Sequence, residues 1–222
     1  MEQEKLATMI DHTILGGNID KETIIEKCEE VKENNFASLC TVPYYVSLAA
    51  EELKQIKSKV CTVIGFPLGN TNYNAKLNET KQALKDGAQE IDMVMNISAF
   101  KDNRYEYVEN EIREIVKTVK NKDEYLIVKV ILETCYLNNA QIKKACEISK
   151  KAGADFVKTS TGFGEEGAKI KDVKLMKMVV GDDMKVKASG GIRSYNKAID
   201  MIEAGASRIG ASSGVEIINY KE

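Results

Sequence analysis

The chain has 222 residues, of which 30% are charged and 43% apolar, a composition typical of a globular protein rather than a disordered one. Its 32 basic and 34 acidic side chains leave a net charge of -2, which argues against nucleic acid and against an anionic membrane surface as partners. No apolar run is long enough to span a bilayer, and the acidic start, Met1–Lys5, lacks the features of a signal peptide.

Short runs rich in β-branched and apolar residues alternate with longer segments of helical period. Before this pattern, Glu2–Met9 is expected to form a short extra helix that closes one end of the fold. The strand-like runs are Thr8–Ile14, Ala37–Val42, Lys59–Ile64, Glu90–Met95, Tyr125–Leu132, Asp155–Lys158, Lys185–Ala188 and Ser207–Ile209. The helix-like segments are Asp20–Asn34, Tyr44–Ile56, Asn74–Asp86, Arg104–Lys120, Asn138–Ala152, Ala168–Val180 and Ser194–Ala204.

This alternation of strands and helices implies a parallel sheet. Eight strands in a chain of this length fit a compact (β/α)8 barrel, or TIM barrel, whose usual size is about 250 residues. No linker or shift in composition divides the chain, so residues 1–222 are predicted to form one α/β barrel domain. An open doubly wound sheet is the alternative fold.

Four of the predicted strands carry charged residues, although both faces of a barrel strand are normally covered by apolar ones. Asp92 lies in the fourth strand and Lys129 in the fifth, while Lys158 and Lys187 lie at the ends of the sixth and seventh. Active sites of such barrels lie at the carboxyl ends of the strands. A single strand-end lysine is explained by an ammonium group that reaches water, but this combination indicates an active site.

The chemistry that suits these residues is amine catalysis. A lysine attacks a carbonyl only as a neutral amine, and burial and a nearby second ammonium both favour that form. Lys158 and Lys187 fit these two roles in either order, and Asp92 fits proton transfer. The pattern therefore predicts a Schiff-base site that requires no metal.

Two glycine-rich loops follow the last two predicted strands, at Ala188–Arg193 and Ile209–Gly214. Glycines let backbone amides approach an anion, and the loops after strands seven and eight are the recurring phosphate site of barrel enzymes. Arg193 and Arg208 lie next to these loops in the sequence. The loops therefore predict a phosphate pocket, with ordinary turn glycines as the alternative.

Other catalytic patterns are absent or poorly formed. The five cysteines include no C-x-x-C pair, which favours a reducing cytoplasm, and with the single histidine, His12, they make no His/Cys metal cage. Gly162–Gly167 matches G-x-G-x-x-G, but it follows a late strand and contains two glutamates, so a mobile loop is favoured over a dinucleotide site. We expect no cofactor and no bound metal.

Long motifs in this chain resemble the deoxyribose-phosphate aldolase family. Lys158–Phe163 reads KTSTGF and Lys187–Arg193 reads KASGGIR. The resemblance runs from about residue 6 to residue 216 and departs from the family pattern at Val42, where members often have asparagine. Further matches occur in the same order at Ile10–Thr13, Thr62–Gly69, Glu90–Val94 and Lys129–Thr134.

The resemblance implies a class I aldolase that cleaves 2-deoxy-D-ribose 5-phosphate to acetaldehyde and glyceraldehyde 3-phosphate. In it, Lys158 is the Schiff-base lysine, Lys187 the ammonium that tunes it, and Asp92 part of a proton relay. The expected substrate contacts are Asp11 and Thr13 at the sugar hydroxyls, the strand residue Lys129, and the phosphate-pocket residues Gly162, Gly190, Gly191, Gly210, Ser212 and Ser213.

Two other functions fit the barrel. One is a Schiff-base aldolase or transaldolase for a different sugar phosphate, against which the motif match argues. The other is a catalytically silent phosphosugar-binding barrel, against which the complete set of Lys158, Lys187 and Asp92 argues. Barrels of this kind often pair through exposed helices, so a homodimer is expected. Longer relatives carry a C-terminal tail that reaches toward the site, and Tyr220 is the candidate for that role here.

Overall fold

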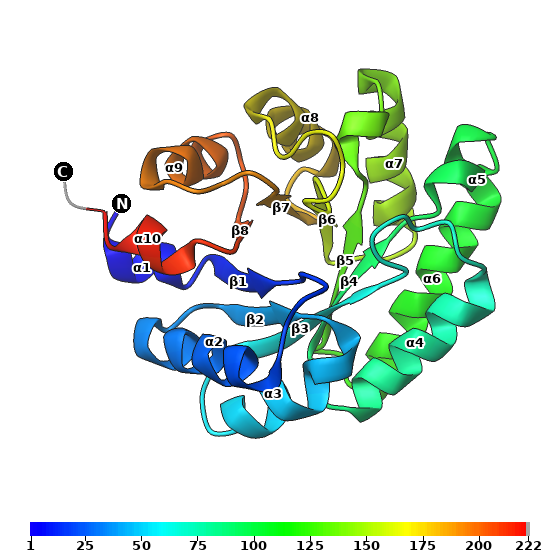
Figure 1. The fold of residues 1–222 in the computed structure, drawn as a ribbon. Helices are drawn as coiled ribbons and strands as arrows, with labels where there is room; N and C mark the ends of the chain where they lie inside the picture. The colour runs from blue at the N-terminus through cyan, green and yellow to red at the C-terminus, as the bar shows by residue number, and fades with distance from the viewer. Residues whose placement is uncertain (221–222) are drawn as a thin grey trace.

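The computed structural model describes residues 1–220, in which eight parallel strands form one closed barrel (Figure 1). Each strand pairs with the next in chain order, and the last pairs with the first. The predicted barrel is thus confirmed, and the open doubly wound sheet, which has two unpaired edges, is excluded. The strands are β1 (Ile10–Ile14), β2 (Ser38–Thr41), β3 (Lys59–Ile64), β4 (Glu90–Val94), β5 (Ile127–Ile131), β6 (Phe156–Lys158), β7 (Lys185–Ser189) and β8 (Arg208–Ala211).

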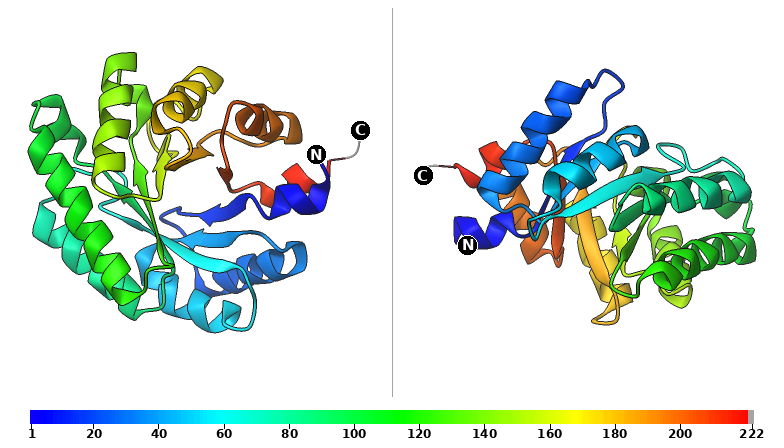
Figure 2. Two further views of the ribbon diagram at one scale, coloured as in Figure 1. Left: turned by 180° about the vertical axis from the view of Figure 1, so that it is seen from behind. Right: turned by 90° about the horizontal axis from the view of Figure 1, so that it is seen from below.

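Helices surround the strands in all of the ribbon views (Figures 1 and 2). Within residues 1–220 no helix is both long and apolar enough to cross a membrane. Two helices of five residues, α5 and α10, are absent from the prediction because so short a segment shows no helical period. The helices are α1 (Gln3–Ala7), α2 (Lys21–Asn34), α3 (Val46–Leu53), α4 (Tyr73–Lys85), α5 (Ile97–Lys101), α6 (Tyr105–Lys122), α7 (Asn139–Lys151), α8 (Ile170–Val180), α9 (Tyr195–Glu203) and α10 (Gly214–Ile218), with 3-10 turns η1 (Pro43–Tyr45) and η2 (Thr134–Tyr136).

The ends of the long helices follow from local sequence. The side chain of Asp20 accepts a hydrogen bond from the Thr23 amide at 2.9 Å, and Asn138 forms a capping box with Gln141. Gly87 follows α4 in a left-handed conformation, with φ of 106°, which a glycine adopts without strain. These residues mark the starts of α2 and α7 and the end of α4.

The strand register brings the charged strand residues together. Asp92 pairs with Lys129 across β4 and β5, and Lys158 pairs with Lys187 across β6 and β7. Lys158 is the last residue of β6, as predicted. Strand β7 continues to Ser189, so Lys187 lies in the middle of its strand and not at the end, as the sequence had indicated.

The two ends of the described chain lie close together beside α1 and α10 (Figures 1 and 2). The ring of Tyr220 stacks on that of Tyr195, with centroids 5.4 Å apart. Its backbone carbonyl accepts a hydrogen bond from Gln3 at 3.4 Å. Tyr220 therefore rests against α9 and α1 and does not reach the charged residues of the barrel interior.

Candidate active site

Asp92 is the centre of a buried ion-pair network inside the barrel. One carboxylate oxygen, Oδ1, accepts from Lys129 Nζ at 2.8 Å. The other, Oδ2, accepts from both Lys158 Nζ and Lys187 Nζ, each at 2.8 Å. Four consecutive strands, β4 to β7, thus each direct one charged side chain to the same point.

A second set of charges lies next to Asp92 toward the amino ends of the strands. Lys129 Nζ lies 2.5 Å from Glu90, and Lys187 pairs with Asp11. Arg208, at the start of β8, pairs with both of these carboxylates. All of these charges are thus linked in one network, called the lumen cluster below: Asp11, Glu90, Asp92, Lys129, Lys158, Lys187 and Arg208.

The electrostatics of the lumen cluster keep its central groups charged. Burial acts to raise the pKa of Asp92, but Lys129, Lys158 and Lys187 outweigh it and hold that pKa well below its ordinary value. Burial acts to lower the pKa of Lys187, but the carboxylates of Asp11 and Asp92 raise it above its ordinary value. Lys187 is therefore a permanent ammonium next to the Lys158 amine.

The two strand lysines differ in access. The side chain of Lys187 is fully buried and contacts two carboxylates, those of Asp11 and Asp92. Lys158, its register partner on β6, retains a small exposed surface and lines a pocket that opens at the carboxyl ends of the strands. Of the two amines, the one that can meet a molecule in this pocket is Lys158.

The pocket above Lys158 is a cavity of about 200 Å³, large enough for a small phosphorylated sugar. It contains six of the predicted substrate-contacting residues: Thr13, Gly162, Gly190, Gly191, Gly210 and Ser212. We call it the mouth pocket; it is lined by Thr13, Leu15, Gly16, Lys158, Thr161, Gly162, Phe163, Ser189, Gly190, Gly191, Ile192, Arg193, Gly210, Ala211 and Ser212.

Three predicted contacts lie outside the mouth pocket wall. Asp11 and Lys129 are fully buried in the lumen cluster, because they lie nearer the amino ends of their strands than Thr13 and Lys158 do. Ser213 is the N-cap residue of α10, next to Ser212. The carboxylate of Asp11 and the ammonium of Lys129 pair with other charges of the lumen cluster, and their contact with substrate stays a prediction.

Arg208 also lies away from the predicted phosphate loops. It begins β8, so its guanidinium reaches Asp11 and Glu90 in the lumen cluster, whereas Arg193 lines the mouth pocket. Proximity in sequence to the loop after β8 was misleading, because the strand separates its two ends in space. Of these two arginines, the pocket has only Arg193 on its wall.

The glycine loops have a shape that other residues cannot easily adopt. Gly190 and Gly191 both have left-handed backbones, with φ of 88° and 70°. A Cβ atom on Gly210 would lie 3.0 Å from Lys187 Cε, so a side chain there would disturb the lysine. These glycines line the pocket wall without side chains, and Gly210 leaves room for Lys187.

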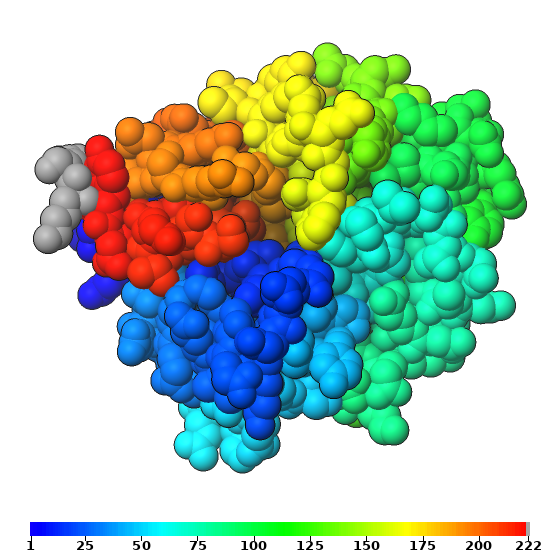
Figure 3. Space-filling model, viewed as in Figure 1, coloured from blue at the N-terminus to red at the C-terminus, as the bar shows by residue number. Residues whose placement is uncertain are grey.

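Segments far apart in the sequence meet at this end of the barrel. Figure 3 shows the blue, cyan and yellow parts of the chain in contact on one face. The rings of Phe66 and Phe163 pack edge to face there, with centroids 5.2 Å apart. A larger hollow of about 710 Å³ lies at the opposite end, near Phe36 and Ser58, but none of the lumen cluster lines it. The chemistry therefore belongs to the smaller pocket.

A family model described as "DeoC/LacD family aldolase" matches residues 5–219. The chain belongs to this aldolase family. A deoxyribose-phosphate aldolase of Caldanaerobacter subterraneus subsp. tengcongensis is 59% identical over 96% of this chain and 92% of its own length. One of Aciduliprofundum boonei is 55% identical over 100% of this chain and 99% of its own. The family resemblance seen in the motifs is thereby confirmed.

Solved structures of aldolases share the same fold. A deoxyribose phosphate aldolase from Aeropyrum pernix, described as a unique tetrameric structure, is 35% identical with a TM-score of 0.91, covering 98% of this chain and 91% of that one. A protein described as "QR15, an Aldolase" is 45% identical with a TM-score of 0.90, covering 96% and 94%. These likenesses extend over nearly the whole barrel of this DeoC/LacD family member.

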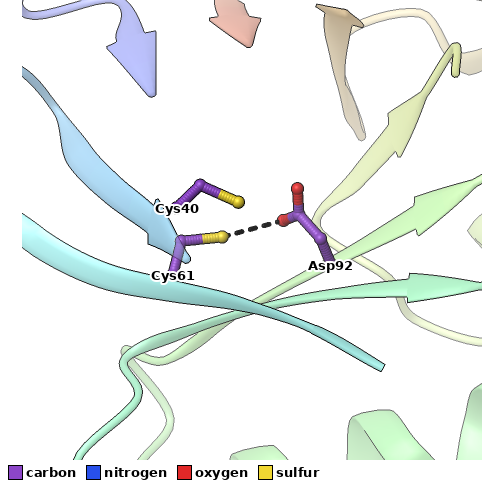
Figure 4. A group of neighbouring side chains, drawn as sticks. All are labelled: Cys40, Cys61 and Asp92. Atoms are coloured by element: carbon purple, nitrogen blue, oxygen red, sulfur yellow. Dashed lines mark hydrogen bonds between the residues drawn. The ribbon is translucent and has the colours of Figure 1, made fainter. Parts of the chain in front are cut away.

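Sequence reasoning missed two cysteines of this aldolase site. Cys40 and Cys61 are register partners on β2 and β3, and both point toward Asp92 (Figure 4). The Cys61 thiol donates to Asp92 Oδ1 at 3.2 Å. Their sequence signal is that each lies in the middle of a predicted strand, and that these two strands are neighbours in the barrel. Because three lysine Nζ atoms already contact the Asp92 carboxylate, these thiols are part of its surroundings rather than a free ligand set.

His12 points away from the mouth pocket. Its ring stacks on Phe36, with centroids 5.0 Å apart, and its Nε2 lies 2.5 Å from the Glu30 carboxylate of α2. Burial lowers its pKa, an effect that Glu30 opposes. The only imidazole of the chain thus connects β1 to α2 and is not part of the active site.

Proposed function

We propose that this chain is a class I aldolase that cleaves 2-deoxy-D-ribose 5-phosphate reversibly to D-glyceraldehyde 3-phosphate and acetaldehyde. The observation that carries the proposal is the Lys158 amine, which lies on the floor of the mouth pocket beside Asp92 and the ammonium of Lys187. The names of its relatives support the choice of substrate.

In this reaction the Lys158 amine adds to the C1 aldehyde of the open-chain sugar, and water leaves to give a protonated imine. A base removes the proton of the C3 hydroxyl, the bond between C2 and C3 breaks, and the electron pair is held in an enamine on Lys158. Glyceraldehyde 3-phosphate leaves. Protonation of the enamine at C2 and addition of water then release acetaldehyde and restore the amine.

The neighbours of Lys158 have complementary roles in this scheme. Asp92 contacts both amines, so it can accept and return protons directly or through water. The Lys187 ammonium lies beside the Lys158 amine, and the two share the Oδ2 atom of Asp92. At the pocket wall, the amides of Gly190, Gly191 and the segment from Gly210 to Ser212 would bind the phosphate.

The test of this function is the release of acetaldehyde from deoxyribose 5-phosphate, coupled to an alcohol dehydrogenase and followed by loss of NADH absorbance. We expect turnover that is retained after dialysis against EDTA, because the protonated imine on Lys158 accepts the electron pair of the C2–C3 bond and no metal is needed for that step. A chain that releases no acetaldehyde, or one that EDTA inactivates and zinc restores, would contradict the Schiff-base mechanism.

We also propose that residues 1–222 work as a single domain, as a homodimer and in the cytoplasm. The unpaired cysteines and the absence of a membrane-crossing helix in residues 1–220 are compatible with that location. The Aeropyrum pernix relative is described as tetrameric, so association has a precedent in the family. Light scattering on the purified protein tests the dimer, and a mass of one or four chains would contradict it.

A further inference from the structure

Glu133 is a buried carboxylate just beyond the lumen cluster. It follows β5, at the carboxyl end of the barrel, and only 2% of its surface is exposed. Its two carboxylate oxygens accept from the Thr161 amide, each at 3.3 Å, and one of them also accepts from the Thr161 hydroxyl. Burial raises its pKa, an effect that these bonds oppose. The side chain does not line the mouth pocket.

The backbone at Glu133 is as unusual as its position. Its φ of 53° and ψ of 68° are left-handed, a conformation that a glutamate rarely adopts. On either side, the amides of Leu132 and Thr134 donate to the carbonyls of Lys158 and Thr159, each at 2.9 Å. From Leu132 to Thr134 the chain advances two residues, while the segment that accepts these bonds advances only one, as in a β-bulge. Strained residues of this kind concentrate at functional sites.

The carboxylate organises the loop that follows Lys158. Thr161, held by Glu133, accepts from the Phe163 amide at 3.0 Å through its hydroxyl oxygen. A Cβ atom on Gly164 would lie 3.1 Å from the Glu133 carboxyl carbon, so the loop closes directly over the carboxylate. Three of the residues in this loop, Thr161, Gly162 and Phe163, form one wall of the mouth pocket.

We propose that Glu133 is a positioning residue, whose carboxylate holds Thr161–Phe163 in the conformation that binds the phosphorylated end of the substrate. The inference rests on the proposed function and deepens it. Glu133 acts through Thr161 rather than on substrate. Its side chain therefore determines affinity for the phosphosugar and leaves the amine chemistry of Lys158 intact.

Two substitutions separate the effect of the hydrogen bond to Thr161 from the effect of the left-handed backbone at Glu133. Glu133→Gln keeps an acceptor oxygen for the Thr161 amide in the same strained backbone. Glu133→Gly adopts the left-handed backbone without strain but removes the acceptor. We expect Glu133→Gln to retain a KM for deoxyribose 5-phosphate within about twofold of the wild type. We expect Glu133→Gly to raise it about tenfold, as loss of a hydrogen bond to a charged group predicts.

Two further readouts make the test specific. The KM for unphosphorylated deoxyribose should rise less in Glu133→Gly than that for the phosphosugar. Borohydride should trap acetaldehyde on Lys158 equally in all three proteins. An unchanged KM for the phosphosugar in Glu133→Gly overturns the proposal. An equal rise of that KM in Glu133→Gln and Glu133→Gly also overturns it, because it would indicate an effect of the negative charge rather than of the hydrogen bond. Failure of trapping in the wild type would instead count against the proposed function.

If Glu133→Gly does not fold, the same bond is tested from the other side. Thr161→Val removes the hydroxyl and keeps the β-branched shape, while Thr161→Ser keeps the hydroxyl. We expect the valine variant, and not the serine variant, to raise the KM for the phosphosugar. Equal KM values for the two variants would overturn the proposal.

Discussion

At the scale of single residues, chemically identical side chains acquire different properties from their depth in the barrel. Lys187 pairs with Asp11 and Asp92 and has no exposed surface, whereas Lys158 lines the mouth pocket. From the sequence alone both were strand lysines with apolar neighbours, and only the family resemblance assigned their roles. The carboxylate partners of Lys187, Asp92 and Asp11, lie about 95 and 176 residues before it in the chain. No local sequence pattern reveals contacts at such separations.

Asp92→Asn tests the residue that connects both lysines. The amide keeps the size of the carboxylate but cannot take a proton or balance the ammonium groups of Lys129 and Lys187. We expect the kcat for deoxyribose 5-phosphate to fall by about 100-fold or more, as for loss of a general acid-base group. Steady-state kinetics check this against Asp200→Asn, which changes an exposed aspartate on α9. Unchanged turnover in Asp92→Asn would remove that residue from the mechanism.

At the scale of elements, long segments were predictable and short or tertiary features were not. The stripe of apolar residues in Arg104–Lys120 predicted α6, whose inner face is buried as expected. The five-residue helices α5 and α10 have no such stripe. Lys76 of α4 and Glu111 of α6 form a fully buried ion pair at 2.8 Å. The sequence does not reveal this pair, because each residue reads as an ordinary polar residue of an amphipathic helix.

That ion pair makes a prediction about the packing of α4 on α6. Burial lowers the pKa of Lys76 and raises that of Glu111, and their mutual attraction opposes both shifts. Lys76→Met leaves Glu111 buried without its partner, which should reduce the free energy of unfolding by about 3–5 kcal/mol. The double variant Lys76→Met/Glu111→Gln should recover part of that loss. Urea denaturation measures both, and a double variant less stable than the single one would contradict this account.

At the scale of the whole molecule, the barrel was predictable because its signal repeats eight times along the chain. Each unit pairs a β-branched run with an amphipathic segment, and glycines such as Gly87 end the helices, so local errors do not change the topology. The depth of each charge was not predictable, because it depends on strand register and tilt. Asp11 and Lys129, for example, were predicted as substrate contacts from sequence, whereas their complete burial in the lumen cluster is visible only in the structure.

The lumen cluster should set the pH limits of stability. Because the pKa of Asp92 is held below its ordinary value of 3.8, its stabilising contribution is present above that pH and is lost as the pH falls through the folded value. Because the pKa of Lys187 is raised above 10.5, its contribution is present below that pH and is lost as the pH rises through the folded value. Burial raises the pKa values of Glu111 and Glu133 above their ordinary value of 4.5. The contribution of these two groups to stability is therefore present below that pH and is lost as the pH rises through the folded values.

Urea midpoints measured from acid to alkaline pH check this expectation. We expect stability to decline below about pH 4 and above about pH 10.5, with a shallower acid decline in Asp92→Asn, which has lost one depressed pKa. A urea midpoint that rises as the pH falls below 4 would contradict the charged state that we assign to the lumen cluster.

We infer that Lys158 forms the imine while Lys187 remains an ammonium. Borohydride reduction in the presence of deoxyribose 5-phosphate or acetaldehyde, followed by peptide mass spectrometry, tests it most directly. We predict a covalent two-carbon adduct from acetaldehyde on the peptide that contains Lys158, and no adduct in Lys158→Ala. An adduct on the peptide that contains Lys187, or one that persists in Lys158→Ala, would contradict the account.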